Sequence, residues 1–456
     1  MSNDTNDTSG QRAGIGQSTR RTFLGGLGAT AGLGTLTGFA EARGGDGGGL
    51  SNAVYYVVRS DGRRPNGHGS NGHGQWSNRD SGRGRDEDGE ASYHVLEGET
   101  GSVAFTTDGT AEEAFQYAFD DLPTGGTVVA SGDDFQFGSP ATLGDDTALV
   151  GQQGTRFVVS RTGMRDDQTT DEQSGHDLIR ARGDDVAIAN IAFDANGTQL
   201  DNHAIQADEC DGLLVANNRT VDGFQMAISF SRCTNVQIVG NEVLDPNWYG
   251  ITSRSAPTGS DRDLRRSENV VIARNYVAGV TYNNIATYNV SNFSVSNNVV
   301  VDGGHSLIAC SPAQQGAIVG NVCRDLTEYA PDPGGEAGIE IEYKETHVRE
   351  EIAGTPLARS FDITISGNQV DNCPVGVLAR TVPSDSDDQA ARETERPYSF
   401  TVTGNTISDA ADAGIRIRSG EAGVVATNTV RNSPAPIEVD ESYAVDIQQG
   451  LNATRE

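Results

Sequence analysis

The chain has 456 residues and a formal net charge of −31, from 64 acidic and 33 basic side chains. A balance this acidic argues against a nucleic-acid partner, because no basic stripe is present to neutralise phosphates. It does not indicate the charge of a substrate.

Residues 1–42 predict an export signal. The run TRRTFL at residues 19–24 resembles the twin-arginine motif, and a weakly hydrophobic Gly/Ala/Leu/Thr stretch follows as far as Ala40. This stretch is too short and too rich in glycine for a stable membrane span, and the small residues Ala40 and Ala42 mark a cleavage site. We expect passage through the twin-arginine translocase, no stable membrane insertion, and a secreted or cell-surface location.

The composition indicates a salty environment. Lys344 is the only lysine, so the other 32 of the 33 basic residues are arginines. Acidic, lysine-poor proteins of low hydrophobicity resemble those of extreme halophiles, in which surface carboxylates hold water and salt screens their repulsion. Twin-arginine export of most secreted proteins is also typical of haloarchaea, so we expect a protein of haloarchaeal type.

Residues 43–104 predict a flexible region rich in Gly, Asn, Arg and Asp, with a strand pair in it. Its two apolar runs, at 54–59 and 93–105, are separated by a polar insertion at 60–90. His68 and His73 in that insertion suggest metal capture, but no carboxylate or cysteine frame accompanies them, which favours a solvated loop.

Residues 105–160 predict an N-terminal cap and the first coils of a solenoid. Thr110 and Glu113 have the spacing of a capping box at the start of a helix. The apolar face of this helix consists of Ala114, Phe115, Ala118, Phe119 and Leu122. Such a helix would cover the open end of a solenoid.

Residues 161–442 contain a repeat centred on asparagine. The repeated residues are Asn218, Asn241, Asn275, Asn298, Asn321, Asn368, Asn405 and Asn428. Four of the seven gaps are 23 residues, and the gaps of 34, 47 and 37 residues read as the same unit plus an insertion. The surrounding frame V-x-I-x-x-N-x-V alternates with period two, as short strands do. Units of this length form solenoid coils, and the leucine skeleton of leucine-rich repeats is absent.

The pattern therefore predicts an all-β chain, a parallel β-helix of about nine or ten coils, with residues 443–456 as a C-terminal tail. The asparagines should stack at one corner, where asparagine tolerates the left-handed backbone conformation and its amide bonds to the equivalent residue one coil away. This is a structural role, and the asparagine row is not expected to be an active site.

The frame and the preceding cap resemble the right-handed parallel β-helix repeat of the pectin lyase-like superfamily, over roughly residues 105–442. The resemblance implies the right-handed fold but no single chemistry, since that superfamily includes lyases, glycoside hydrolases, esterases, epimerases, tailspikes and non-catalytic surface proteins. The polygalacturonase-like motifs N-T-D, D-D, G-H-G and R-I-K are mostly missing, and only Gly304-His305-Ser306 is similar to the third. The calcium carboxylates of pectate lyases are absent too, so no catalytic residue is carried over from the resemblance.

Stacking the repeats instead predicts a site on the outside of the coils. Trp248, Tyr282 and His305 hold one position in successive coils and should form a column of rings suited to sugar faces. The expected substrate-binding residues are Trp248, Arg254, Tyr282, Tyr288 and Arg380. The expected catalytic residues are His305, Lys344, Glu340 and Glu342. Insertions at 254–267, 343–360 and 381–397 should wall this groove.

Two classes of function remain open. The first is a polysaccharide-active enzyme on an acidic polysaccharide. A lyase, which needs cations or a metal to neutralise a carboxylate plus a base, is favoured over a hydrolase, which needs two carboxylates. The second is a non-catalytic carbohydrate-binding, adhesion or structural protein, in which the charged residues only form ion pairs between coils, such as Glu342 with Arg380 and Arg416 with Glu438. No motif specifies a cofactor, although Ca²⁺ is compatible with the lyase alternative.

Five cysteines lie inside the repeat. Cys210 and Cys233 hold the same place in consecutive coils, at a separation compatible with a disulfide. Cys310 and Cys323 fall at core positions, and the spacing fits no zinc motif. Buried small apolar residues are the favoured interpretation.

Overall fold

The computed structural model describes residues 54–60, 91–122, 124–160, 177–197, 203–253, 265–326, 337–344, 348, 355–383 and 394–455. The expected signal peptide at 1–42, His68, His73 and Arg254 lie outside these residues. So do most of the three insertions, which begin where β18, β27 and β30 end.

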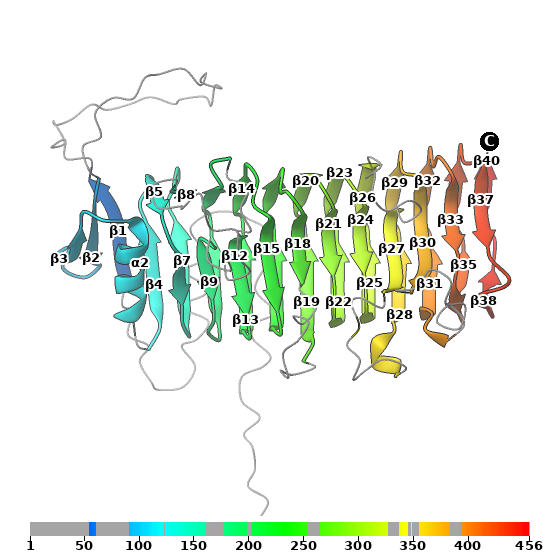
Figure 1. The fold of residues 1–456 in the computed structure, drawn as a ribbon, viewed down its shortest axis with the longest axis horizontal. Helices are drawn as coiled ribbons and strands as arrows, with labels where there is room; N and C mark the ends of the chain where they lie inside the picture. Colours follow the sequence, from blue (N-terminus) through cyan, green and yellow to red (C-terminus); the bar gives the residue numbers. More distant parts are fainter. Residues whose placement is uncertain are drawn as a thin grey trace, which may run out of the picture. The chain divides into compact units, whose positions relative to one another are not determined.

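The described chain winds into coils whose strands stack into three sheets (Figure 1). Sheet A receives β4 (Gly126–Ala130), β7 (Thr147–Gly151), β10 (Val186–Ala189), β13 (Asp211–Ala216), β16 (Thr234–Val239), β19 (Ser267–Ala273), β22 (Val290–Ser296), β25 (Ala313–Val319), β28 (Phe361–Ser366), β31 (Tyr398–Thr403), β34 (Gly420–Glu421), β35 (Val424–Ala426), β38 (Ala444–Val445) and β39 (Gln448–Gln449).

Sheet B contains β5 (Asp134–Phe137), β8 (Arg156–Val159), β11 (Ala192–Asp194), β14 (Arg219–Val221), β17 (Glu242–Leu244), β20 (Tyr276–Val280), β23 (Val299–Gly303), β26 (Val322–Leu326), β29 (Gln369–Asp371), β32 (Thr406–Ser408), β36 (Thr429–Arg431) and β40 (Ala453–Arg455). Sheet C contains β6 (Ala141–Leu143), β9 (Ile179–Ala181), β12 (His203–Asp208), β15 (Met226–Ser231), β18 (Tyr249–Ser253), β21 (Asn283–Thr287), β24 (Ser306–Cys310), β27 (Ala337–Lys344), β30 (Val375–Val382), β33 (Ala413–Ile417) and β37 (Ala435–Val439). A 3₁₀ helix, η2 (Pro356–Ala358), precedes β28.

The fold prediction is confirmed: the described chain is a right-handed parallel β-helix. Each strand pairs in parallel with the strand one coil before it, and the inward residues stack in register. One fully buried column in sheet C consists of Ile205, Ile228, Ile251, Ile285, Ile308, Ile339, Val377 and Ile415. Each coil thus buries its apolar face only against its neighbours.

Sheet C has 11 strands within the described residues, slightly more than the nine or ten coils expected. The difference arises because the first coils lack the repeated asparagine. Ile191 occupies that position one coil before Asn218, and its backbone N–H donates to the Asn218 side-chain oxygen at 3.1 Å. The asparagine count therefore underestimates the number of coils.

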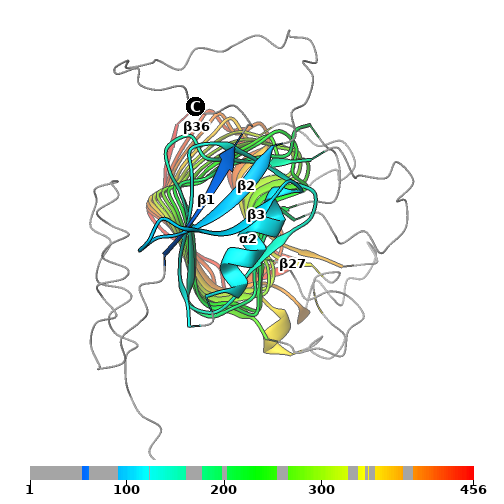
Figure 2. The same ribbon diagram turned by 90° about the vertical axis from the view of Figure 1, so that its left-hand side faces the viewer.

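The N-terminal end of the solenoid is covered by a helix and three strands (Figure 2). The helix α2 (Ala111–Asp120) buries its predicted apolar face, including Phe115. Strands β1 (Val54–Ser60), β2 (Ser92–Glu97) and β3 (Val103–Thr107) form an antiparallel ribbon, which joins sheet A because β1 pairs in parallel with β4. The capping box is absent, because the Thr110 side chain makes no cap hydrogen bond and Glu113 accepts one from Thr107 instead.

The repeated asparagines stack at one corner, as predicted. Asn298 shows the typical pattern. Its side-chain oxygen accepts a hydrogen bond from the backbone N–H of Asn275 at 2.9 Å, and its amide nitrogen donates one to the Ile272 carbonyl at 2.9 Å. The row extends further than the eight predicted residues, because Asn452 accepts from Asn428 in the same way. The pattern predicts the left-handed conformation for the asparagines themselves, and this prediction is wrong. The conformation belongs to the residue before each asparagine, as at Gly240 and Asn297.

Within the described residues, no helix has the length and apolarity needed to cross a membrane.

Candidate functional site

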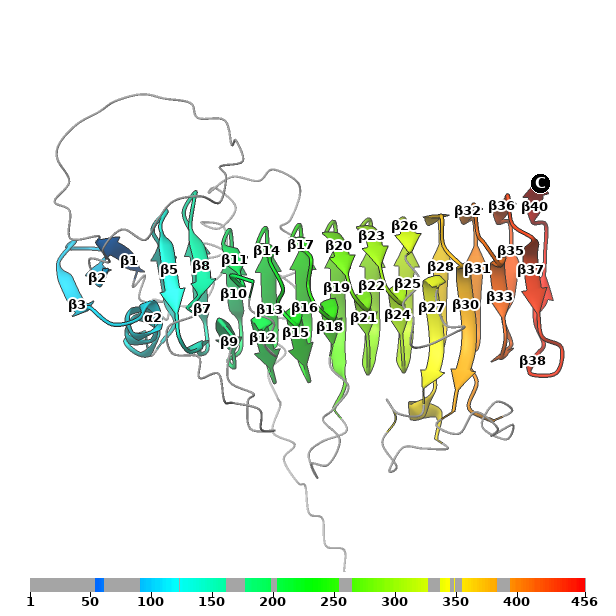
Figure 3. The same cartoon turned by 45° about the horizontal axis from the view of Figure 1, so that its top comes forward.

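The predicted column of rings lies along sheet C. Trp248, Tyr282 and His305 directly precede β18, β21 and β24, which are neighbouring strands of this sheet (Figure 3). The column is held in register by the backbone, because Tyr282 N donates to Trp248 O and His305 N donates to Tyr282 O, each at 3.0 Å. The Trp248 and Tyr282 ring centroids are 6.4 Å apart, and those of Tyr282 and His305 are 4.4 Å apart.

The rings differ in exposure and orientation. Trp248 is 43% exposed, Tyr282 is half-buried and His305 is buried. The Trp248 and Tyr282 planes meet at 65°, so the column is not one continuous flat platform. Trp248 is the member that presents its ring to solvent.

Three residues that the sequence analysis did not select complete this part of the site. They are Tyr249, Asn283 and Ser306, which occupy one outward position at the start of β18, β21 and β24. These residues stand two positions before Ile251, Ile285 and Ile308 of the buried sheet C column, so the repeat spacing alone places them in one row. Tyr249 contacts the Tyr282 and Tyr288 rings edge-on, at centroid distances of 5.3 and 5.9 Å.

Asn283 connects the rings to each other. Its amide nitrogen donates to the Tyr288 hydroxyl at 2.6 Å, and its oxygen accepts from the Ser306 backbone N–H at 2.9 Å. The same oxygen lies 3.2 Å from His305 Nδ1, which places a proton on that nitrogen. Tyr288 itself is buried, and burial raises the pKa of its hydroxyl well above the ordinary value. Tyr288 therefore supports the site from below rather than contacting solvent.

The two predicted glutamates lie beneath the surface, in an ion pair with Arg380. Glu340, Glu342 and Arg380 are 0%, 2% and 7% exposed. Arg380 Nε donates to Glu340, and Arg380 Nη2 lies 3.5 Å from Glu342 Oε2. Ser306 Oγ donates to the other Glu340 oxygen at 2.7 Å. The expected pairing of Glu342 with Arg380 between coils is therefore present, as is that of Arg416 with Glu438 at 2.8 Å.

One of the two carboxyl groups has a strongly shifted pKa. Burial, together with the charge of Glu340, raises the pKa of Glu342 to about 8. At neutral pH Glu342 therefore keeps its proton. Both carboxyls also share one partner, because the Arg380 guanidinium lies within ion-pair distance of each.

Lys344 joins the glutamates to the rings. Its ammonium donates to the Tyr282 hydroxyl at 3.3 Å and lies 6.0 Å from the centre of that ring. Burial alone would lower the pKa of Lys344, but Glu342 and Tyr282 outweigh it, so the pKa is raised and the side chain stays charged. The cluster thus holds two cationic side chains, Lys344 and Arg380, beside a Glu342 carboxyl that keeps its proton at neutral pH. This arrangement favours an anionic ligand.

Among the residues that the structure describes, no group of three or more His, Cys, Asp or Glu side chains is placed to hold a metal ion.

Comparisons with known proteins agree with the architecture. A family described as "Periplasmic copper-binding protein (NosD)" matches residues 260–449, which are 190 of the 456 residues. No curated protein matches the chain. The chain is similar to the solved structure of PfbA, a surface adhesin of Streptococcus pneumoniae, at 15% identity and a TM-score of 0.51, covering 76% of this chain and 89% of that one.

A second similar structure is a hyperthermoactive exopolygalacturonase from Thermotoga maritima. The identity is 13%, the TM-score is 0.52, and the match covers 75% of this chain and 87% of that one. Likeness at such identities shows the fold and not the activity. One of the two proteins is an adhesin and the other is an enzyme. The fold therefore does not distinguish a binding protein from an enzyme, and that distinction rests on the residues of the site.

Proposed function

We propose that this protein binds an acidic polysaccharide on the outer face of sheet C and cleaves it as a lyase. The observation that carries the proposal is the Lys344 ammonium on the Tyr282 hydroxyl, next to the exposed Trp248 ring. Trp248 binds an apolar sugar face, and Lys344 neutralises the carboxylate of a uronate. Arg380 pairs with both glutamates of β27, the strand that also carries Lys344.

A lyase reaction uses such an arrangement in two steps. Neutralising the carboxylate makes the proton on the adjacent carbon more acidic, and a base removes that proton. The glycosidic oxygen on the next carbon then leaves with its electron pair, and a carbon–carbon double bond forms. Tyr282 is the proposed proton acceptor, because its hydroxyl accepts a hydrogen bond from Lys344. Burial raises the pKa of Tyr282, and Lys344 offsets part of that rise. His305 lies against the Tyr282 ring and keeps it in place.

The shared ion pair with Arg380 disfavours the hydrolase alternative. Hydrolysis needs an acid and a nucleophile or base that can reach the substrate, whereas Glu340 and Glu342 are buried and both lie within ion-pair distance of Arg380. Their burial favours a second candidate, a non-catalytic surface protein that binds carbohydrate or serves in adhesion. In that case only Trp248 and its neighbours would contact sugar.

The proposed setting is outside the cell, in high salt. The twin-arginine motif supports export, and the acidic, lysine-poor composition supports a halophilic source. Replacing Arg20 and Arg21 by lysine should retain full-length precursor in the cell, as measured by immunoblotting cell and medium fractions. Normal secretion of the double variant would refute this route.

A substrate screen separates the candidates. The purified protein is incubated in molar salt with a panel of polyuronates, and both the absorbance of unsaturated products and the reducing ends are followed. A lyase yields both signals, whereas a hydrolase yields reducing ends without the absorbance. Binding to immobilised polysaccharide with neither signal would identify the surface-protein alternative.

A further inference from the structure

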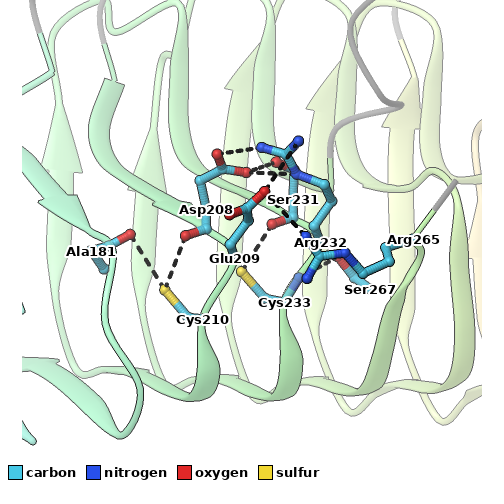
Figure 4. A network of polar contacts seen from close by, with 9 residues as sticks. All are labelled: Ala181, Asp208, Glu209, Cys210, Ser231, Arg232, Cys233, Arg265 and Ser267. Carbon is cyan, nitrogen blue, oxygen red and sulfur yellow. Dashed lines mark hydrogen bonds and ion pairs between the residues drawn. The ribbon is translucent and has the colours of Figure 1, made fainter. Parts of the chain in front are cut away.

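A pair of thiols lies at the corner where sheet C leads into sheet A (Figure 4). This corner belongs to other coils than Lys344, which lies on β27. Cys210 follows β12 and Cys233 follows β15 one coil later. Their neighbours Asp208 and Ser231 are register partners, and Thr234 N donates to Cys210 O at 2.8 Å. The preceding residues, Glu209 and Arg232, have φ values of 59° and 54°. The backbone therefore turns in the same way at both cysteines, so the thiols occupy equivalent positions.

The two thiols are buried at equivalent positions in consecutive coils. Cys210 and Cys233 are 2% and 0% exposed, and both are free. Cys210 Sγ lies 3.3 Å from Ala181 O, and Cys233 Sγ lies 3.1 Å from Ser231 O. The influence of each thiol on the other raises the pKa of Cys210 and lowers that of Cys233. Cys233 is therefore the better nucleophile of the pair.

We infer that Cys210 and Cys233 form an oxidisable dithiol that closes to a disulfide linking two consecutive coils. Strands in one sheet lie about 4.8 Å apart, which is within the range of about 4.4 to 6.8 Å between the Cα atoms of a disulfide. Both cysteines lie in the turn between strands rather than in the hydrogen-bonded ladder, so the side chains can adjust without breaking strand pairing. An exported protein meets the oxidising conditions that such a bond needs.

The oxidant is the disulfide of a small molecule or of a thiol–disulfide oxidoreductase. The Cys233 thiolate attacks one sulfur of that disulfide, which forms a mixed disulfide and releases one thiolate. The Cys210 thiolate then attacks the Cys233 sulfur, forms the protein disulfide and releases the second thiolate. The oxidant gains two electrons and becomes a dithiol, which takes up the two protons lost by the cysteines.

Polar contacts cover this corner on the outside (Figure 4). Ser231 Oγ donates to Asp208 Oδ1 at 2.5 Å, and Arg232 pairs with both Asp208 and Glu209. Oxidation therefore requires that this corner open, either during folding or in a later fluctuation. Once formed, the disulfide would restrain the same opening and raise the temperature at which these coils unfold.

Peptide mapping of the exported protein tests the inference directly. The protein is denatured with an alkylating agent and no reductant, digested and analysed by mass spectrometry. We expect a cross-linked peptide pair containing Cys210 and Cys233, with Cys310, Cys323 and Cys373 alkylated. Alkylation of all five cysteines, or a bridge between Cys323 and Cys373 alone, would overturn the inference.

Stability provides the second measurement. Thermal unfolding of the purified chain is followed after reduction with dithiothreitol and, in a parallel sample, after reoxidation with oxidised glutathione. The oxidised form should unfold at a higher temperature, and Cys233→Ser should abolish this difference. Cys310→Ser, a buried thiol in the same solenoid, should retain it. An equal response of Cys233→Ser and the parent chain would contradict the proposed pair.

Discussion

The asparagine corner and the outer face of sheet C both stack buried polar side chains, but they satisfy them differently. At the corner the same hydrogen bonds repeat in each coil from Asn218 to Asn452. Each asparagine side chain accepts a hydrogen bond from the backbone of the asparagine one coil before it. On sheet C the residues differ from coil to coil, and Glu340 depends on Ser306 and Arg380, which lie 34 and 40 residues away in sequence. A regular stack can be explained by the fold alone. An irregular stack that concentrates charge calls for another explanation, which we take to be ligand binding.

The largest expected effect comes from breaking the regular stack. Asn298→Ala removes the acceptor for Asn275 and the donor to Ile272, all in the buried corner. Unpaired buried groups cost about 1 to 3 kcal/mol each, so the free energy of unfolding should fall by about 3 kcal/mol or more. Chemical denaturation measures this change.

Asn292→Gly is the control, because Asn292 bonds to Asn269 in an exposed row of side chains and glycine adopts its φ of 50° without strain. Its effect should stay within about 0.5 kcal/mol. Equal effects of the two variants would show that the corner asparagines are not structurally special.

Substitutions in the irregular stack of sheet C should instead change catalytic activity. Lys344→Met removes the charge that neutralises the substrate and should lower turnover by roughly a hundredfold or more, with little loss of stability. Arg416→Met is the control, since Arg416 pairs with Glu438 on the same sheet outside the cluster. If steady-state assays on the cleaved polyuronate show full activity for Lys344→Met, catalysis lies elsewhere.

A substitution of the exposed Trp248 ring should weaken polysaccharide binding more than it slows turnover. Trp248→Ala should weaken polysaccharide binding by about 1 to 3 kcal/mol, the scale of one lost stacking residue, with a modest effect on turnover. Tyr276→Ala is a suitable comparison, because Tyr276 is similarly exposed, at 40%, but lies on sheet B. Calorimetric titration that finds equal losses for both would rule out the sheet C face as the binding surface.

A further effect concerns pH. Because the pKa of Glu342 is raised to about 8, the folded chain binds a proton there that the unfolded chain has released above pH 4.5. This contribution to stability is present at low pH and is lost as the pH rises towards 8. Denaturation at several pH values should show Glu342→Gln gaining stability relative to the parent chain across that range, whereas Glu438→Gln at the surface should not. A constant difference would mean that Glu342 is ionised throughout.

Local patterns were sufficient to predict the coils. An asparagine at a fixed offset within an alternating apolar frame leaves one register in which every coil buries its apolar face. The helix α2 followed from its apolar face, although its capping contact did not, because Thr107 competes for Glu113. The asparagine row also missed Asn452 and the coils before Asn218, where Ile191 holds the same place without the side chain that marks it.

Row position also predicted that Trp248, Tyr282 and His305 would stack, since residues at one offset in successive coils lie one above another. It did not predict that Glu340 and Glu342 would be buried, that the pKa of Glu342 would be raised, or that Tyr249 would join the rings. An outward position in a coil does not establish exposure to solvent. Burial and protonation depend on the size and charge of neighbours contributed by other coils, and those neighbours do not follow the repeat, so only the tertiary structure could decide them.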